Sequence, residues 1–375
     1  MIADPARKLH VPSEWEAAAA EIFDRRLRTI LVIGGSAVGK SSFCRYLADA
    51  LLARQAEVAF VDADIGQSNL GPPATVTLGY PTSPVDFSAM SPVGYYFVGS
   101  TGPMGRFLPL VIGTASLAGE ARGAFVIIDT TGLVHESGRI LKSYKIEAVR
   151  PDAIVAIERR SELAPIRMAN RHVPIIRIEP SRKAHGKDDC ERIEMRRRSY
   201  ARHFAGAASL ELPLESLIFQ RTLLFAGKPI ELEGAVHAES SSEGILIVGA
   251  PVAPPPDSKL LPAGFERNLL SGLADLTGHC LGLGIIERID FATRTIALTT
   301  VVERDKIRIV QFGDLYVTPE GGELGQVQVG VVAGNPRSGE ATGGESAVIS
   351  VIAMRRPPRP LRPAYASSPM CRASR

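Results

Sequence analysis

Short apolar runs alternate with helical patterns through the first half of the chain. The runs are nearly continuous rather than interrupted by polar residues, which is typical of parallel strands covered by helices on both faces. They occupy residues 30–33, 58–61, 95–98, 124–128, 153–157 and 173–178. A helical pattern precedes them at residues 13–28, and a highly charged one follows at residues 182–204. The pattern predicts an α/β fold built on a doubly wound, mostly parallel sheet.

The pattern changes near residue 229 to short strands separated by glycine and proline turns. Clear strand signals lie at residues 245–248, 284–289, 295–299 and 327–332. Such closely spaced strands predict an additional C-terminal β-rich domain. The expected organisation is an N-terminal helical segment at 1–28, an α/β domain at 29–215, the β-rich domain at 216–354, and a disordered basic tail rich in proline and arginine at 355–375.

A glycine-rich segment joins the first apolar run to the next helical pattern. Residues 34–41 read Gly-Gly-Ser-Ala-Val-Gly-Lys-Ser, a complete G-x-x-x-x-G-K-[ST] phosphate-binding loop in its expected strand–loop–helix context. Backbone N–H groups and a helix N-terminus favour phosphate oxygens there, Lys40 would reach the β- and γ-phosphates, and Ser41 would offer its hydroxyl to Mg²⁺. The expected nucleotide-binding residues are Gly34, Gly35, Ser36, Ala37, Val38, Gly39, Lys40, Ser41 and Ser42.

Two aspartates and a glutamine follow the second apolar run, in the sequence Asp-Ala-Asp-Ile-Gly-Gln at residues 62–67. Ligands bind beyond the carboxyl ends of parallel strands, so this turn and the phosphate-binding loop are expected at the same edge of the sheet. Phosphoryl transfer needs one carboxylate at the attacking hydroxyl and others at the metal. Asp64 suits the first role and Asp62 the second, while a helix-capping role is the alternative for Asp62.

Two further segments carry candidate chemistry. Another apolar run closes on Asp129 and continues Thr-Thr-Gly at residues 130–132, which suits a magnesium and γ-phosphate sensor in a nucleotide hydrolase as well as in a kinase. The charged helix holds a cluster of arginines at residues 192–202. Such a cluster can close over transferring phosphates or grip a phosphate backbone, although a solvated helix face is equally compatible with its composition.

Composition narrows the classes of protein without selecting one. The chain has 375 residues, of which 45% are apolar and 22% charged, as in ordinary globular domains. No apolar run is long enough for a membrane span, and four scattered cysteines fit a reducing cytoplasm. The net charge is +3, but residues 355–375 hold six arginines and no acid, which leaves about −3 for the rest of the chain. Global charge therefore gives no argument for nucleic-acid binding.

Together these segments resemble the P-loop polynucleotide 5′-hydroxyl kinases, whose eukaryotic members serve the pre-mRNA cleavage factor and ribosomal RNA processing. The resemblance covers most of residues 29–340. Residues 62–67 match the family's D-x-D-x-G-Q segment, in which the second aspartate is the catalytic acid/base. Residues 96–103 are similar to the segment that clasps the substrate phosphate, and residues 192–204 to the arginine lid. The chain is identified as a compact, prokaryote-type member.

The resemblance implies transfer of the γ-phosphate of ATP, with Mg²⁺, to the 5′-hydroxyl end of RNA or DNA, and a protein partner in RNA processing. It implies catalytic roles for Lys40, Asp64, Arg192, Arg196 and Arg197, substrate binding by Gln67, Thr101, Thr130 and Gly132, and metal binding by Ser41, Asp62 and Asp64.

Two positions depart from the family pattern. Leu133 stands where the family has a tryptophan, and Gly105-Arg106 stands where an asparagine is expected. An aromatic platform contributes about 1–3 kcal/mol of base stacking, so its loss predicts weaker stacking or a different substrate end.

Two other functions are compatible with parts of the sequence. A partner-regulated NTPase or scaffold would share the phosphate-binding loop but would not need Asp64 with Gln67 or the arginine cluster. The residues after the run at 153–157 lack the Asn-Lys-x-Asp guanine reader, which argues against a GTP switch. A nucleic-acid-binding module based on the basic tail is the third possibility, although the tail has no aromatic interleaving beyond Tyr365.

Overall fold

The computed structural model describes residues 10–121, 124–182, 184, 186–256, 258–326, 330–333 and 348–351. The chain divides into two compact units, Met1–His203 and Phe204–Arg375. Among the described residues, no helix has the length and apolar character that crossing a bilayer requires. The basic tail predicted for residues 355–375 lies outside the described residues.

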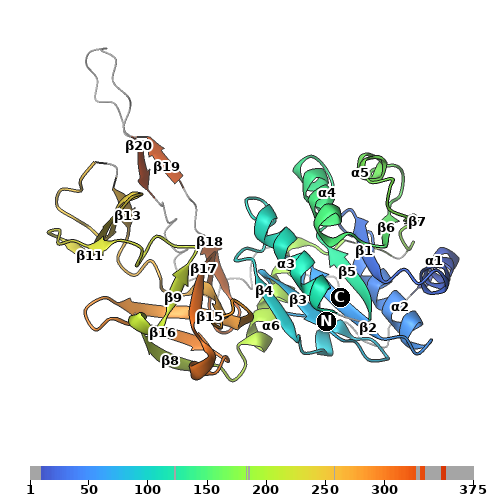
Figure 1. Ribbon diagram of the computed structural model, residues 1–375, viewed down its shortest axis with the longest axis horizontal. Helices are drawn as coiled ribbons and strands as arrows, with labels where there is room; N and C mark the ends of the chain where they lie inside the picture. Colours follow the sequence, from blue (N-terminus) through green and yellow to red (C-terminus); the bar gives the residue numbers. More distant parts are fainter. Residues whose placement is uncertain are drawn as a thin grey trace, which may run out of the picture. The chain divides into compact units, whose positions relative to one another are not determined.

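The first unit alternates strands and helices along the chain (Figure 1). Its strands are β1 (Thr29–Gly34), β2 (Val58–Ala63), β3 (Thr75–Gly79), β4 (Gly94–Phe97), β5 (Phe125–Thr130), β6 (Ala153–Ile157) and β7 (Ile175–Ile178). Its α-helices are α1 (Ser13–Asp24), α2 (Lys40–Leu52), α3 (Phe107–Glu120), α4 (Ser137–Val149), α5 (Ala164–Ala169) and α6 (Asp189–His203), and Phe87–Ala89 form a short 3₁₀ helix.

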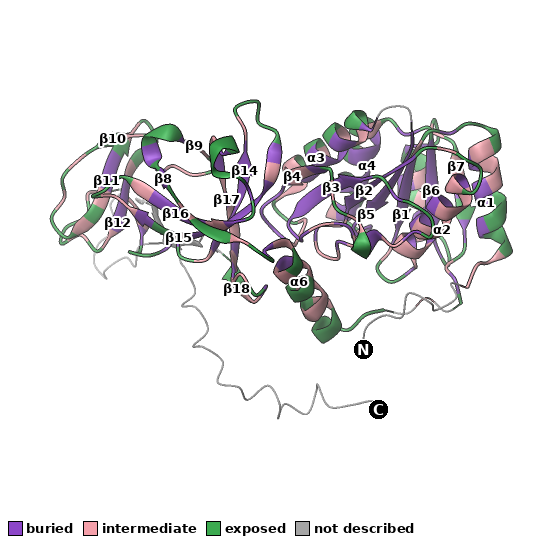
Figure 2. Cartoon of the chain, turned by 90° about the horizontal axis from the view of Figure 1, so that it is seen from below, coloured by how far each residue is buried: buried purple, intermediate pink, exposed green. Residues whose placement is uncertain are grey.

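One twisted sheet organises this unit, with the strand order β4–β3–β2–β5–β1–β6–β7. Strands β2, β5, β1, β6 and β7 run parallel. One set of alternating strand side chains packs with α1 and α2, and the other set packs with α3, α4 and α5. Figure 2 shows the buried strands between helices whose outer faces are exposed. The predicted α/β fold with a mostly parallel sheet is therefore confirmed, and it places the ends of β1, β2 and β5 at one edge.

Two strands at one side of the sheet break the parallel pattern. Strand β3 pairs antiparallel with β2, and β4 pairs antiparallel with β3. Between β2 and β3, and between β3 and β4, the chain lacks an α-helix that could carry it across the sheet, so each strand returns in the opposite direction. The apolar pattern does not single out β3, because Val and Leu are the only apolar residues in its sequence Thr-Val-Thr-Leu-Gly.

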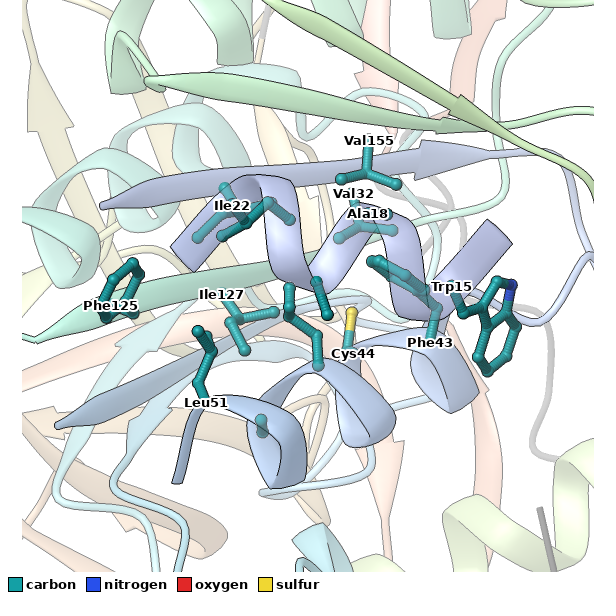
Figure 3. Close-up of a cluster of buried hydrophobic side chains, with 14 of the residues drawn as sticks. Trp15, Ala18, Ile22, Val32, Phe43, Cys44, Leu51, Phe125, Ile127 and Val155 are labelled. Carbon is teal, nitrogen blue, oxygen red and sulfur yellow. The ribbon is translucent and has the colours of Figure 1, made fainter. Parts of the chain in front are cut away.

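The N-terminal helix is fixed to the sheet through an aromatic contact with α2. The side chain of Trp15 is fully buried, and its ring meets Phe43 edge to face with 5.3 Å between centroids (Figure 3). Ile22 and Cys44 belong to the same cluster of apolar side chains. Burying each large side chain of this cluster contributes about 1.5–3 kcal/mol to the free energy of unfolding. These contacts hold α1 against α2, the helix that begins at the end of the phosphate-binding loop.

The second unit is made almost entirely of strands in two sheets. One sheet contains β18 (Glu323–Gln326), β17 (Ile309–Val317), β14 (Leu269–Ala274), β15 (Cys280–Asp290), β16 (Thr295–Thr300) and β8 (Ala208–Pro213) in that order, with β9 (Ile218–Gln220) also paired to β17. The other has the order β10 (Lys228–Pro229), β11 (Ala235–Ser241), β12 (Gly244–Gly249), β13 (Lys259–Leu261), β20 (Val348–Val351) and β19 (Gly330–Ala333). Short 3₁₀ helices lie at Leu214–Ser216 and Arg304–Lys306.

Apolar side chains from both sheets of this unit share one core. Strand β8 pairs antiparallel with β16 of this unit, although its residues fall inside the α/β domain predicted for 29–215. A local sequence pattern shows that a segment is a strand but not which distant strand it joins. The strand expected over 327–332 lies partly outside the described residues, and β18 and β19 flank the undescribed part.

Candidate active site

The phosphate-binding loop leaves β1 and enters α2 through residues that need unusual backbone angles. Gly39 has φ = 92° and Ala37 has φ = 62°, both in the left-handed region. A side chain at Gly34 would clash with its surroundings, because a Cβ there would lie 2.8 Å from the carbonyl oxygen of Ile157. The Nζ atom of Lys40 donates to the carbonyl oxygen of Gly35 at 2.8 Å. The lysine therefore bends back across the loop, where a bound phosphate would replace that carbonyl as its partner.

Ser41 and Asp129 form the second feature of the site. The Ser41 hydroxyl donates to Oδ2 of Asp129, the last acidic residue of β5, at 2.5 Å. Burial raises the pKa of the Asp129 carboxyl, which Lys40 opposes and Asp64 reinforces. A hydroxyl and a carboxylate at contact distance are the hard oxygen donors that Mg²⁺ prefers, so this pair fits a magnesium ion. The sequence predicts Ser41 as a metal ligand and predicts magnesium sensing for the segment that begins at Asp129, although Asp129 itself is not among the predicted ligands.

Asp62 is buried beside Asp129. The two residues are direct register partners on the adjacent parallel strands β2 and β5, and both are fully buried. Burial and repulsion by Asp129 raise the pKa of Asp62 to about 7, against hydrogen bonds from backbone N–H groups that favour its charged form. Two carboxylates this close cannot both be ionised without compensating positive charge.

Asp62 was predicted to bind the metal, but both of its carboxylate oxygens are engaged in hydrogen bonds within the turn. Its Oδ2 atom accepts hydrogen bonds from the Asn69 N–H at 2.6 Å, the Leu70 N–H at 3.1 Å and the Ser68 hydroxyl at 3.2 Å. Its Oδ1 atom accepts from the Asp64 N–H at 3.1 Å. Both oxygens thus hold the backbone of the turn after β2. We interpret Asp62 as the anchor of this turn, closer to the capping alternative than to metal binding.

Asp64 is presented by that turn. Its Oδ1 atom accepts from the N–H groups of Gly66 at 3.3 Å and Gln67 at 3.2 Å. None of the hydrogen bonds found among the described residues uses its Oδ2 atom. A Cβ on Gly66 would lie 2.7 Å from the carbonyl oxygen of Thr101, so the turn packs against the segment that resembles the substrate clasp. The side-chain amide of Gln67 donates to the Gly66 carbonyl at 3.0 Å.

The segment after β5 reaches the phosphate-binding loop through Gly132. A Cβ on Gly132 would lie 2.8 Å from Cα and 2.9 Å from the amide nitrogen of Ser36. Thr130 behaves differently from its predicted role in substrate binding. It is fully buried, and its hydroxyl donates to the Val32 carbonyl of β1 at 2.8 Å, so it ties two strands together. Gly132 remains at the site and Thr130 lies beneath it.

Replacing Gly132 with alanine is expected to weaken ATP binding. The new methyl group would press on the backbone of Ser36, which cannot move aside as a side chain can. Overpacking of this kind costs about 1–3 kcal/mol, equivalent to about 5- to 150-fold in affinity. Calorimetric titration with ATP measures the effect. The matched control is Gly119→Ala on α3, where the added Cβ meets no atom within 4 Å. Equal ATP affinities of the two variants would contradict the close approach.

Helix α6 and the residues before it are the segment that the sequence predicts to be an arginine lid. Ala184 and Gly186 pack against the phosphate-binding loop, since a Cβ on Gly186 would lie 3.4 Å from Cβ of Ala37. One guanidinium nitrogen of Arg192 donates to the Ser36 hydroxyl at 3.3 Å. Arg196 is half-buried one helical turn further on, so it shares a helix face with Arg192. The structure therefore brings Arg192 to the nucleotide loop.

Arg197 lies on a different face of the same helix. Its guanidinium makes two hydrogen bonds with the carboxylate of Glu194, at 2.7 and 2.9 Å, and Arg198 donates to the same group at 2.7 Å. These hydrogen bonds lower the pKa of Glu194 to about 2. Arg197 is exposed and paired within the helix, so the geometry does not support its predicted catalytic role. Arg197 follows Arg192 by five residues on the helix, so its side chain points in another direction, away from the loop that Arg192 contacts.

Comparisons with known proteins identify a matching family, similar sequences and a similar fold. Residues 34–206 match the family described as the mRNA cleavage and polyadenylation factor CLP1 P-loop. The chain is 36% identical over 339 residues to the polyribonucleotide 5′-hydroxyl-kinase of Pyrococcus furiosus, covering 84% of this chain and 95% of that protein. It is 31% identical to the protein of the same description from Methanocaldococcus jannaschii, covering 79% and 89%. The solved Clp1p–Pcf11p complex contains a chain of similar fold, with a TM-score of 0.58 and 12% identity over 81% of this chain and 79% of that one.

Proposed function

The chain belongs to the family of P-loop polyribonucleotide 5′-hydroxyl kinases, and from this premise we propose that it transfers the γ-phosphate of ATP to the 5′-hydroxyl end of a polynucleotide. The observation that carries the proposal is the convergence of Lys40, the Ser41–Asp129 pair and the Asp64 carboxylate at one edge of the sheet. A phosphate-binding loop alone would serve any NTPase. A carboxylate on the neighbouring turn adds an acceptor for the proton of an attacking hydroxyl.

In the proposed reaction, one bond to phosphorus forms while another breaks, and each residue of the site has a defined role. The 5′-oxygen of the acceptor forms a bond to the γ-phosphorus of ATP, while the bond from that phosphorus to the β,γ-bridging oxygen breaks and ADP leaves. Asp64 orients the hydroxyl and takes its proton. Lys40 and the N–H groups of residues 34–42 hold the phosphates, whose charge increases at the leaving oxygen. Positioning and electrostatic stabilisation supply most of the rate enhancement in such transfers.

Magnesium would be held by Ser41 and Asp129 in this scheme. A bound Mg²⁺ would neutralise charge shared by the β- and γ-phosphates. Asp62 keeps the turn in place, and Asp64 lies close enough to influence the Asp129 carboxyl. The proposed metal set therefore replaces Asp62 with Asp129 and keeps Ser41, whereas Asp64, also predicted as a metal ligand, is assigned to the acceptor hydroxyl.

The lid would act through Arg192 and Arg196 rather than through Arg197. Arg192 already contacts Ser36 of the loop, so a short movement of its side chain would bring it to a γ-phosphate. Arg197 would first have to leave Glu194. On the acceptor side, Gln67 and Thr101 lie in the turn segments around Asp64, and Gly132 abuts Ser36 of the phosphate-binding loop.

The acceptor is proposed to be RNA, since the archaeal relatives are described as polyribonucleotide kinases, with DNA as the other candidate. A protein partner is also proposed, because the solved chain of similar fold is in complex with Pcf11p.

Incubation of the purified protein with γ-labelled ATP, Mg²⁺ and oligonucleotides of one sequence tests the function. RNA and DNA versions are compared, each with a 5′-hydroxyl and with a 5′-phosphate. We expect label on the 5′-hydroxyl forms and none on the 5′-phosphate forms, with RNA labelled faster. ATP hydrolysis without end labelling would overturn the kinase proposal and favour a partner-regulated NTPase.

A further inference from the structure

Two lysines of α4, Lys142 and Lys145, are fully buried in the first unit. Lysine is almost never buried completely unless a partner compensates its charge, because removing an ammonium from water is costly. The two residues lie three positions apart and therefore on one face of the helix, the face that packs toward the sheet. Neither residue is explained by the roles proposed above.

Each ammonium contacts the backbone of a segment that carries the site. Nζ of Lys142 donates to the Thr131 carbonyl oxygen at 2.6 Å and lies 3.3 Å from the Thr131 hydroxyl. Nζ of Lys145 lies 3.5 Å from the carbonyl oxygen of Ala63, the last residue of β2. Thr131 directly precedes Gly132, and Ala63 directly precedes Asp64. The lysines thus hold the two peptides from which the candidate site residues depart.

The charges that surround Lys145 are the carboxylates of the site. Burial lowers the pKa of Lys145 to about 7, and Asp64, Asp129 and Asp62 oppose this decrease. Burial also lowers the pKa of Lys142, reinforced by the like charges of Lys145 and Lys40. Opposite charges in a low-dielectric interior stabilise each other strongly, so the lysine and the carboxylates favour each other's charged forms.

We propose that Lys145 is a positioning residue for Asp64, with Lys142 supporting it: the ammonium holds the Ala63 carbonyl and offsets the charge of three converging carboxylates. The inference rests on the proposed kinase function and deepens it. Without this internal cation, the carboxylates would repel one another and the turn that presents Asp64 would lose its fixed support. The buried ammonium also competes with Mg²⁺ for the same negative charge.

The substitution Lys145→Met tests the inference, because methionine keeps most of the aliphatic volume and removes only the charged group. We expect kcat to fall by about 10- to 100-fold, as is usual when a group that orients a catalytic or ligating residue is lost, with the KM for ATP within threefold of the parent. The melting temperature should fall, because removing one partner of a buried charge cluster leaves the carboxylates uncompensated, so kcat is measured well below the melting transition and is referred to the amount of folded protein.

A second measurement separates this role from a merely structural one. The melting temperature is followed while Mg²⁺ is titrated at a saturating concentration of a non-hydrolysable ATP analogue. Loss of the lysine charge should lower the Mg²⁺ midpoint by about threefold or more, because the carboxylates then attract the metal more strongly. A lysine that only fills space would leave that midpoint unchanged.

The matched control is Leu141→Met, a volume-conserving change at a buried position of the same helix that should leave kcat and the Mg²⁺ midpoint at parent values. The inference is overturned if Lys145→Met keeps kcat within threefold of the parent, or if its loss of activity matches a loss of folded protein. If the parent itself labels no acceptor, the proposed function fails, whereas the Mg²⁺ midpoint still reports on Lys145.

Discussion

Replacing Lys40 with methionine is expected to lower kcat for phosphoryl transfer by about 10²- to 10³-fold. Lys40 is only 7% exposed, and its ammonium lies across the loop that would hold the phosphates. A cation in such a dry, preformed position stabilises the charge that develops on the leaving oxygen far more than a cation in water does. Methionine preserves the stem of the side chain and removes this charge. Single-turnover transfer of label from γ-labelled ATP to a 5′-hydroxyl oligonucleotide measures the loss.

The control for this prediction is Lys228→Met, which removes an exposed lysine from β10 of the second unit. Its kcat should equal that of the parent. ATP affinity of Lys40→Met should also decrease, because in the proposed complex the lysine would contact the phosphates before and during the transfer. A kcat within tenfold of the parent would show that the arginines of the lid, rather than Lys40, supply the main positive charge.

The sequence was sufficient for the fold and for the nucleotide loop. Continuous apolar runs such as 153–157 predict buried parallel strands, and β6 has these bounds. Residues 34–41 predict the loop because its glycines are required by the backbone. In the structure, Gly34 leaves no room for a Cβ and Gly39 has a left-handed φ. The family resemblance is confirmed by archaeal relatives with more than 30% identity over most of the chain.

The sequence was less informative about the direction in which each polar side chain faces. Asp62 and Thr130 lie in the last two positions of their strands and were expected at the ligand, yet both are fully buried and hydrogen-bonded to backbone groups. Their orientation depends on register, since Asp62 pairs with Asp129 across two strands that are distant in the sequence. The burial of Lys142 and Lys145 could not be predicted from the sequence either, because lysines at such a spacing usually lie on a solvated helix face. These features come from tertiary packing rather than from local pattern.

The charge arrangement of the site explains why such burial is tolerated. Equal numbers of carboxylates and lysines, three of each, gather at the site, and groups of opposite sign partly offset the cost of burying charge there. The carboxylates are Asp62, Asp64 and Asp129, and the lysines are Lys40, Lys142 and Lys145. Arriving ATP and Mg²⁺ would together add negative charge. The arginines of the lid, which lie outside this balanced set, are suited to neutralise that addition.

Replacing Asp64 with asparagine is expected to lower kcat by about 10²- to 10⁴-fold while leaving ATP affinity nearly unchanged. An asparagine Oδ1 can still accept the hydrogen bonds from the N–H groups of Gly66 and Gln67, so the turn should keep its shape. The lost properties are the negative charge and the ability to take a proton from the acceptor hydroxyl. Because these hydrogen bonds are kept, the melting temperature should stay close to that of the parent.

The contrasting variant is Asp62→Asn. Both oxygens of Asp62 accept hydrogen bonds from donors of the turn, among them the Asn69 N–H, so an amide NH₂ there would face a donor and lose at least one bond. A buried donor without a partner costs about 1–3 kcal/mol, and we therefore expect a lower melting temperature together with a weaker apparent affinity for the acceptor. Melting curves and single-turnover labelling, run on both variants, distinguish the two aspartates. A chemical role for Asp64 is contradicted if its asparagine variant transfers label within tenfold of the parent, and the anchoring role of Asp62 is contradicted if its variant melts at the parent temperature.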